Sequence, residues 1–519
     1  MDKKTQKYDR QLRLWGGHGQ EALGASKVCL INGSAVGTET LKNLILPAIG
    51  SFTVVDDKPV SGSDAGNNFF LTQDSIDQPR AKCVTELLRE LNEEVEGNHV
   101  EQNPTDIMAN NPEFFHQFNL VITTQLPESI VLPLAEICWN ANIPLFVVRV
   151  NGFFGYFRIA LPEHTIVEPH PEQLLDLRLD CPFPALIEYA NKFDFESTDT
   201  LALSHIPYIA ILLRCLQEHK RTHGGAVPSL SELRQLIRQL QSKDLSDPEN
   251  FDEAHNSAFK ARQQTTIPRA IEQILNDPKA EDITNTSSDF WILARAVRDF
   301  VANEGNGLLP LAGTVPDMKS DTESFVVLQT IYKTKAKEDV QSVQRRVSQL
   351  LTSVGKSADS IPQGYVDAFC KYSAHLRVIR YRSLREEYEK PLGQYIASKL
   401  ADLDDNIVYY VLHRAVDRFF ETHKRYPGYH NHEVETDVGL LKKCVTSLLS
   451  EWQVSASTPL DDHLHEIVRA GASELHSVSS LLGGIVSQEA IKVLTRQYVP
   501  MDNTVVVNTV RSTSSVYTL

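Results

Sequence analysis

Cysteine is scarce in this sequence, and its spacing gives no sign of a disulfide framework. Seven cysteines are scattered over 519 residues, and no two of them form a C-x-x-C motif. This usage is typical of reduced thiols in the cytosol or nucleus. The first residues, Met1-Asp-Lys-Lys, also lack the apolar core of a signal peptide. We therefore expect a cytoplasmic and nuclear protein.

Long apolar runs and an excess of positive charge are absent as well. No apolar run approaches the ~18 residues of a membrane-spanning helix. Acidic residues outnumber basic ones by 67 to 51, which gives a net charge of −16. This balance argues against general binding to nucleic acids or anionic membranes, and it allows a basic surface on a protein partner. A chain of this length should hold two or more domains.

Three pairs of nearby histidines give little reason to expect a metal. Zinc sites combine several cysteine or histidine ligands at short or helical spacing, and these pairs lack such companions. We expect no metal site at any of the pairs, which are His164 with His170, His430 with His432, and His463 with His465.

The stretch 28–68 has the form of a βαβ nucleotide-binding unit. A short apolar run at 28–31 leads into a turn that contains glycine, then into an amphipathic run that ends near Ile49. A second apolar run follows and ends in Asp56. In a working unit the turn places backbone N–H groups against phosphate at the helix N-terminus.

The turn departs from the G-x-G-x-x-G pattern of such units. Asn32 and Ser34 stand where the first two glycines should be, while Gly33 and Gly37 remain in the loop. Asparagine tolerates the positive φ that the first glycine adopts, but serine adds a Cβ where phosphate would approach. The turn therefore predicts a Rossmann-like unit with a weakened phosphate grip.

Strand and helix patterns alternate beyond this unit. Apolar runs at 119–123 and 145–150 predict buried strands with a helix between them, which indicates a mostly parallel, doubly wound sheet. Three prolines in 162–171 suggest a domain boundary, and most of the following sequence has helical periodicity. A final apolar helix at 481–494 contains Gly483-Gly484, for which close helix packing is the expected reason.

These patterns predict an α/β protein with a Rossmann-like doubly wound sheet and a large, mostly helical inserted domain. The first domain would comprise residues 1–165 and 470–519, and the helical domain residues 166–469.

Four longer motifs occur towards the two ends of the chain. They are Tyr8-Asp-Arg-Gln-Leu-Arg-Leu-Trp-Gly16, Gly37-Thr-Glu-Thr-Leu-Lys-Asn-Leu44, Gly50-Ser-Phe-Thr-Val-Val-Asp56 and Leu482-Gly-Gly-Ile-Val-Ser-Gln-Glu-Ala-Ile-Lys492. In this order they resemble the activating enzymes of ubiquitin-like proteins. The resemblance implies an adenylation domain of ThiF/MoeB type and a helical domain similar to the family's catalytic-cysteine domain.

The sequence departs from the pattern of active family members. Those members hold ATP with an Asn-x-Asn-Arg-Gln-Phe segment after the second strand and with a lysine that follows it. Here Asn67 stands at the arginine position and Arg80 at the lysine position. Replacing a cation beside phosphates with a neutral amide removes transition-state stabilisation. We therefore expect an inactive adenylation domain that binds no ATP, with a lost site made of Asp64, Gly66, Asn67, Asn68 and Arg80.

The cysteines of the helical domain do not match the family's thioester cysteine. None of the seven cysteines is followed by threonine, as that residue is in the family. Cys215 and Cys444 lie in amphipathic patterns and are expected to be packing residues. Cys181 precedes a proline in a loop, and Cys370 lies near a helix end. We expect no thioester on this chain.

The resemblance implies that this chain is the non-catalytic half of an obligate heterodimer. Its catalytic partner would bind ATP and magnesium, adenylate the C-terminal glycine of a Nedd/Rub-type ubiquitin-like modifier, and take the modifier onto its own cysteine as a thioester. By its position in the opening motif, Arg10 would reach in trans to the partner's ATP, with Arg13 as the second choice. Leu12, Leu14 and Trp15 would anchor this arm.

Three other functions stay open. A dinucleotide-dependent oxidoreductase needs an intact G-x-G-x-x-G and a proton-relay residue, and tight NAD binding would support it. A self-sufficient activating enzyme for another modifier would catalyse ATP–pyrophosphate exchange without a partner. A pure scaffold or adaptor would leave activation unchanged when Arg10 is replaced.

Overall fold

The chain divides into two compact units. The computed structural model describes residues 6–172, 176–197, 199–241, 245, 247–454 and 460–519. The first unit comprises Met1–His164 and Val378–Leu519, and the second comprises Thr165–Arg377. The first boundary lies at the predicted place, but the chain returns to the first unit at Val378 rather than near residue 470. The predicted helical domain, 166–469, is therefore too long by the helices that follow residue 378.

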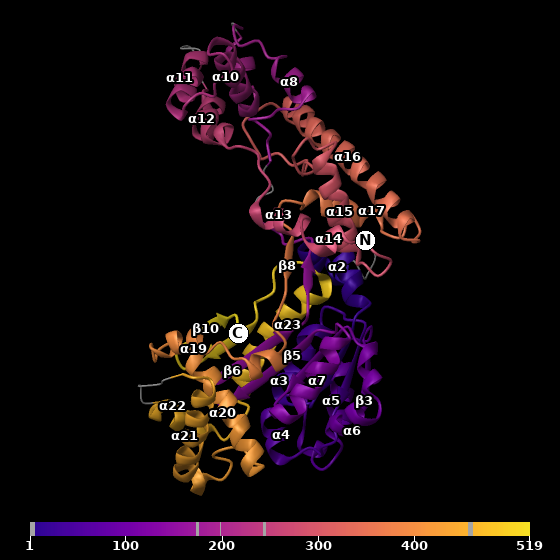
Figure 1. The fold of residues 1–519 in the computed structure, drawn as a ribbon, viewed down its shortest axis with the longest axis vertical. Coiled ribbons are helices and arrows are strands. Elements are labelled where there is room, and N and C mark those ends of the chain that lie inside the picture. Colours follow the sequence, from indigo (N-terminus) through magenta and orange to yellow (C-terminus); the bar gives the residue numbers. More distant parts are fainter. Residues whose placement is uncertain (1–5, 173–175, 198, 242–244, 246, 455–459) are drawn as a thin grey trace. The chain divides into compact units, whose positions relative to one another are not determined.

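An eight-stranded sheet lies at the centre of the first unit (Figure 1). Its strand order is β10-β9-β6-β5-β4-β1-β2-β3, in which β1 to β5 run parallel and β6, β9 and β10 are antiparallel. This architecture confirms the predicted doubly wound α/β class. The strands are β1 (Lys27–Ile31), β2 (Ser51–Val55), β3 (Glu96–Val100), β4 (Leu120–Thr124), β5 (Leu145–Asn151), β6 (Phe154–Ala160), β9 (Thr504–Asn508) and β10 (Thr513–Tyr517).

Alternate side chains of the sheet enter two separate apolar cores. Val28 and Leu30 of β1 face one core, and Cys29 and Ile31 face the other, as the period of two in a strand requires. The first core is closed by α2 (Asp9–Gly24), α3 (Ala35–Ile45), α5 (Arg80–Arg89) and α23 (His476–Thr495). The second is closed by α6 (Pro104–Asn110), α7 (Glu128–Asn140), α18 (Leu384–Glu389), α19 (Gly393–Leu400), α20 (Ile407–His423), α21 (Val434–Glu451) and α22 (Asp461–Ala470).

Helices α18 to α22 explain the difference from the predicted domain boundary. Their apolar faces cover one side of the sheet, and Val408, Val411 and Leu412 of α20 belong to the same core as Val121 and Val147. A sheet with only one face covered would leave those strand residues in water. The segment 378–470 is therefore part of the sheet unit.

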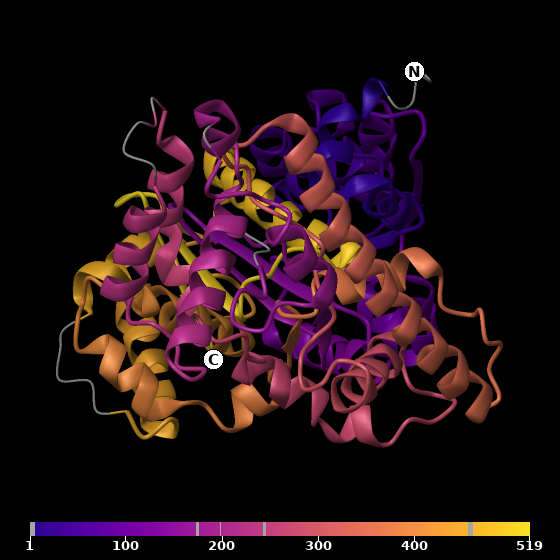
Figure 2. The same cartoon turned by 90° about the horizontal axis from the view of Figure 1, so that it is seen from above.

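The C-terminal helix α23 packs tightly against α3, the first helix after β1. This helix, yellow in Figure 2, contacts both α3 and α2. A Cβ atom at Gly483 would lie 2.9 Å from Cβ of Glu39 and 3.0 Å from the backbone nitrogen of Thr40. Close packing therefore accounts for Gly483 as predicted. It does not account for Gly484, where a Cβ would meet open space.

The second unit is mainly helical. Its apolar core is built largely from α8, α10, α11, α12 and one part of the long helix α16 (Figure 1). The helices are α8 (Pro184–Ala190), α9 (Thr200–Ser204), α10 (Tyr208–Thr222), α11 (Leu230–Leu240), α12 (Glu249–Ser257), α13 (Arg269–Leu275), α14 (Pro278–Glu281), α15 (Asp289–Ala302), α16 (Thr322–Ser353) and α17 (Gln363–Lys371). Two short strands, β7 (His164–Ile166) and β8 (Arg377–Ile379), form a separate sheet.

Among the described residues, no helix combines the length and the apolar character needed to cross a membrane.

Candidate functional site

The turn between β1 and α3 lies where the strand order of the sheet reverses, between β1 and β4. In open α/β sheets this is the place where ligands bind. Asn32 adopts a φ of 70°, which is the left-handed conformation that the first glycine of the motif would have. Its side chain donates to the backbone oxygen of Thr124 at 2.8 Å, and the Ser34 hydroxyl donates to Thr124 Oγ1 at 3.0 Å. The two residues that replace glycine therefore tie the turn to β4.

The two glycines that remain in the turn have different tasks. A Cβ at Gly37 would lie 2.9 Å from Cδ1 of Leu30, so this glycine lets α3 pack closely on β1. The N–H group of Gly33 donates to Asp56 Oδ2 at 2.8 Å. The packing role of the motif is thus retained, while one backbone donor of the turn is already engaged inside the chain.

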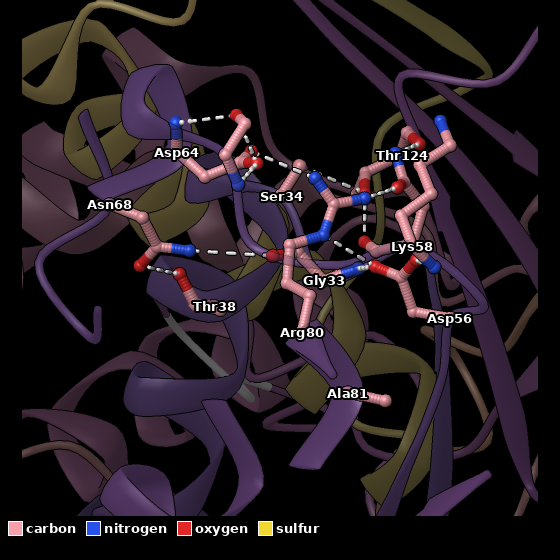
Figure 3. A network of polar contacts seen from close by, with 12 residues as sticks. Gly33, Ser34, Thr38, Asp56, Lys58, Asp64, Asn68, Arg80, Ala81 and Thr124 are labelled. Carbon is pink, nitrogen blue, oxygen red and sulfur yellow. Dashed lines mark hydrogen bonds and ion pairs between the residues drawn. The ribbon is translucent and has the colours of Figure 1, made fainter. Parts of the chain in front are cut away.

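Arg80 lies at the centre of a buried polar network at this edge of the sheet (Figure 3). Its Nε donates to Asp56 Oδ2 at 2.7 Å and its Nη1 to Asp64 Oδ1 at 2.8 Å. Its Nη2 donates to the side-chain oxygen of Asn32. The acid at the end of β2, which binds ribose hydroxyls in dinucleotide-binding folds, is therefore bound by the protein's own guanidinium.

Asp64 connects this network to the short helix α4 (Gly62–Asn67). Its carboxylate accepts from the backbone N–H of Ser61 at 2.8 Å and from the Ser61 hydroxyl at 2.6 Å, which completes a capping box. Burial would raise the pKa of Asp64, but the charge of Arg80 and the bonds from Ser61 outweigh it and lower the pKa. Asp64 therefore forms a structural ion pair with Arg80 in this network.

The N-terminus of α3 holds a carboxylate of the same chain. Glu474 Oε2 accepts from the backbone N–H of Ala35 at 3.2 Å, and Oε1 accepts from that of Val36 at 3.0 Å. These groups carry the positive end of the helix dipole, which in nucleotide-binding units faces phosphate. Burial raises the pKa of Glu474, although the two N–H bonds, Ser34 and the charge of Arg80 act in the opposite direction.

The arrangement as it stands does not fit a bound nucleotide. A phosphate would need the two N–H groups that Glu474 occupies, and a ribose would need the carboxylate that Arg80 and Gly33 occupy. Within this chain, the carboxylate of Glu474 takes the place of the phosphate, and the guanidinium of Arg80 takes the place of the ribose.

The other members of the predicted lost site are not all brought together. Asn68 belongs to the network: its amide nitrogen donates to the Gly33 oxygen at 3.3 Å, and its oxygen accepts from the Thr38 hydroxyl at 3.0 Å. Gly66 is exposed on α4, and a Cβ there would meet open space. Asn67 is half-buried at the end of α4.

Arg10 and Arg13 lie outside this network, on the exposed side of α2. Arg13 is paired with Asp9 at 2.9 Å, whereas Arg10 forms no ion pair with the described residues. Trp15 is buried and anchors the helix as predicted, but the side chain of Leu14 is 54% exposed. Leu14 therefore does not anchor the arm within this chain, whereas Tyr8 is buried.

Comparison with known proteins places this chain in a family. The model of the ThiF family matches residues 8–517. The NEDD8-activating enzyme E1 regulatory subunit of Gallus gallus is 48% identical over 99% of this chain and 98% of its own length. The NEDD8-activating enzyme E1 regulatory subunit AXR1 of Arabidopsis thaliana is 41% identical over 98% and 95%. The chain belongs to the ThiF family. Within it, the chain belongs to the family of these regulatory subunits, which confirms the resemblance drawn from the motifs.

The cysteines of this family member carry no sign of an activated thiol. Cys215 is buried in α10, and burial raises its pKa to about 12. Cys370 is buried in α17, and burial raises its pKa as well. Cys181 is exposed, but partial desolvation and the charge of the neighbouring Asp180 raise its pKa too. A thioester cysteine needs the thiolate, which these surroundings disfavour. Among the described residues, no group of three or more histidine, cysteine or acidic side chains could hold a metal ion.

The sequence did not indicate Thr124 or Glu474 as parts of the site. Thr124 ends β4 and is separated from Asn32 by 92 positions, and Glu474 is separated from Ala35 by 439. A position at the carboxyl end of a parallel strand could have suggested Thr124. Nothing in the local sequence distinguishes Glu474 from other glutamates.

Acid should weaken the Arg80 network through Asp64. The lowered pKa means that Asp64 stabilises the fold above its ordinary pKa of about 3.9, and that this contribution is lost as the pH falls through the folded-state value. We expect Asp64→Asn to lower the Tm at pH 6, and the difference from the parent protein to shrink between about pH 5 and pH 3. Thermal unfolding at several pH values measures this. The exposed Asp74→Asn serves as the control, and a difference independent of pH would contradict the prediction.

Proposed function

We propose that this chain is the regulatory subunit of a heterodimeric activating enzyme for a NEDD8/Rub-type ubiquitin-like modifier. The matched relatives bear that name, and the similarity extends over nearly the whole of each chain. In this role the chain pairs with a catalytic subunit and completes its adenylation site. The partner adenylates the C-terminal glycine of the modifier and receives it as a thioester.

The observation that carries the non-catalytic part of the proposal is the position of Arg80. Its guanidinium forms ion pairs with Asp56 and Asp64 at the edge of the sheet where this fold would hold a nucleotide. A guanidinium with two carboxylate partners in a buried setting is held in place by charge-assisted hydrogen bonds. ATP and magnesium are therefore assigned to the partner, and this chain contributes no nucleotide site of its own.

The same proposal assigns the remaining properties of the chain. The pairing is obligate, with an interface above about 2,000 Å². The scattered cysteines support a place in the cytoplasm and nucleus. The absence of a cysteine followed by threonine supports a helical unit without a thioester. Arg10, exposed on α2, is the group that reaches the partner's ATP in trans.

ATP–pyrophosphate exchange with the purified modifier tests the proposal. The assay compares this chain alone, the catalytic subunit alone, and the two mixed. Exchange that requires the mixture is the expected result, because neither chain alone holds a complete site. Exchange by this chain alone would contradict the proposal and support a self-sufficient activating enzyme.

A further inference from the structure

The carboxylate of Glu474 takes the place that a phosphate has in related nucleotide-binding units. It comes from the segment before α23 and meets the N-terminus of α3, with one oxygen on each of two consecutive backbone N–H groups. Two such bonds to an anion use the donors that a helix leaves unpaired at its start. The same carboxylate is attracted by the charge of Arg80.

The backbone around Glu474 is held in place independently of its side chain. The N–H of Gly152, which follows β5, donates to the backbone oxygen of Ser473 at 2.9 Å, and Gly152 forms an isolated β-bridge with Glu474. Gly152 has a φ of +58°, and a Cβ there would lie 2.6 Å from Cβ of Ala470. The segment therefore docks on the sheet through its backbone, and the side chain of Glu474 is presented to α3.

Charge at this place repels a second anion. The carboxylates of Asp56 and Asp64 bind the guanidinium of Arg80, and the nearby carboxylate of Glu474 is attracted by the same charge. A phosphate that approached the start of α3 would have to displace one carboxylate and remain beside two others. In a partly buried setting such like-charge contacts are costly.

We propose that Glu474 is a built-in anion that occupies the phosphate position of this chain and excludes phosphate compounds from it. The inference deepens the proposed function and rests on it only in that the chain binds no ATP itself. It attributes the loss of ATP binding to the Glu474 carboxylate as well as to the changed residues of the loop. The N–H groups of α3 remain able to bind an anion when this carboxylate is removed.

Direct binding of pyrophosphate tests the proposal. Glu474→Ala uncovers the N–H groups of Ala35 and Val36, and we expect its affinity for pyrophosphate to exceed that of the parent chain about tenfold or more, since two charge-assisted hydrogen bonds become available. Isothermal titration and the rise of Tm with added pyrophosphate measure the change. Glu435→Ala, which removes an exposed acid of α21, controls for the lost charge and is expected to behave like the parent.

The design separates this inference from the proposed function. If Glu474→Ala is too unstable to titrate, Glu474→Gln takes its place, because the amide lacks the charge and is expected to permit pyrophosphate binding as well. Affinities in both variants equal to that of the parent would overturn the inference and leave the proposed function standing. Tight ATP binding by the parent chain would overturn both.

Discussion

Replacement of Arg10 by alanine is expected to lower ATP–pyrophosphate exchange by the assembled heterodimer about 10³-fold, the scale of an arginine finger in other phosphoryl-transfer systems. In this chain Arg10 is exposed on α2 and lies outside the Arg80 network. A guanidinium held out from one subunit can stabilise charge that develops on phosphates held by another. The effect should appear in the rate of exchange and not in assembly of the pair.

The control variants for Arg10 come from the same helix. Arg13 is paired with Asp9, so Arg13→Ala is expected to have a small effect. Arg10→Lys should restore little activity, because an ammonium lacks the planar fork of donors that contacts two phosphate oxygens. Size-exclusion chromatography of the mixed subunits verifies assembly. Full exchange with Arg10→Ala would favour the scaffold alternative, and a larger loss with Arg13→Ala would transfer the role to Arg13.

The β1–α3–β2 unit could be predicted from sequence because its determinants are local. The alternation of apolar runs gives the elements, and the conformation of the turn follows from the residue types within it. Asn32 does adopt the positive φ that its residue type tolerates, and Gly37 does pack on Leu30. The contact of the Arg80 guanidinium with Asn32 could not be predicted in this way, because it depends on three-dimensional packing.

The parts that sequence could not supply depend on contacts over long separations. Glu474 meets α3 only because α23 packs on that helix, which no local pattern expresses. The domain boundary was misplaced for a similar reason. An amphipathic helix such as α20 has the same periodicity whether its apolar face meets another helix or a sheet. Only the structure shows that Val408 and Val411 share a core with strand residues.

A buried ion pair between Arg158 and Glu387 allows the domain boundary to be tested by measuring stability. Arg158 lies in β6 and is fully buried, and its Nε donates to Glu387 Oε2 at 2.7 Å. Glu387 lies in α18 and also accepts from the Tyr410 hydroxyl at 2.8 Å. The two charges are thus satisfied by one another and by hydrogen bonds within the sheet unit. Removal of Glu387 leaves the Arg158 charge buried with only the backbone oxygens of Ile159 and Arg382 as hydrogen-bond partners.

We expect Glu387→Ala to lower the free energy of unfolding of the sheet unit by about 3–5 kcal/mol, because it strands the Arg158 charge. Arg385→Ala, on the same helix but with its side chain 61% exposed, should change it by less than about 0.5 kcal/mol. Urea unfolding followed by tryptophan fluorescence measures both in a Trp291→Phe background, in which the three remaining tryptophans, Trp15, Trp139 and Trp452, all lie in the sheet unit.

The double variant Arg158→Met/Glu387→Met separates the cost of a stranded charge from the value of the pair. Since apolar residues of similar volume often replace a buried ion pair without loss, the double variant should recover most of the stability. If α18 belonged to the helical domain, as the sequence suggested, Glu387→Ala would instead leave the transition reported by the three tryptophans of the sheet unit unchanged. A shift of the sheet-unit transition places the chain's return before Leu384, because only then does α18 unfold together with β6.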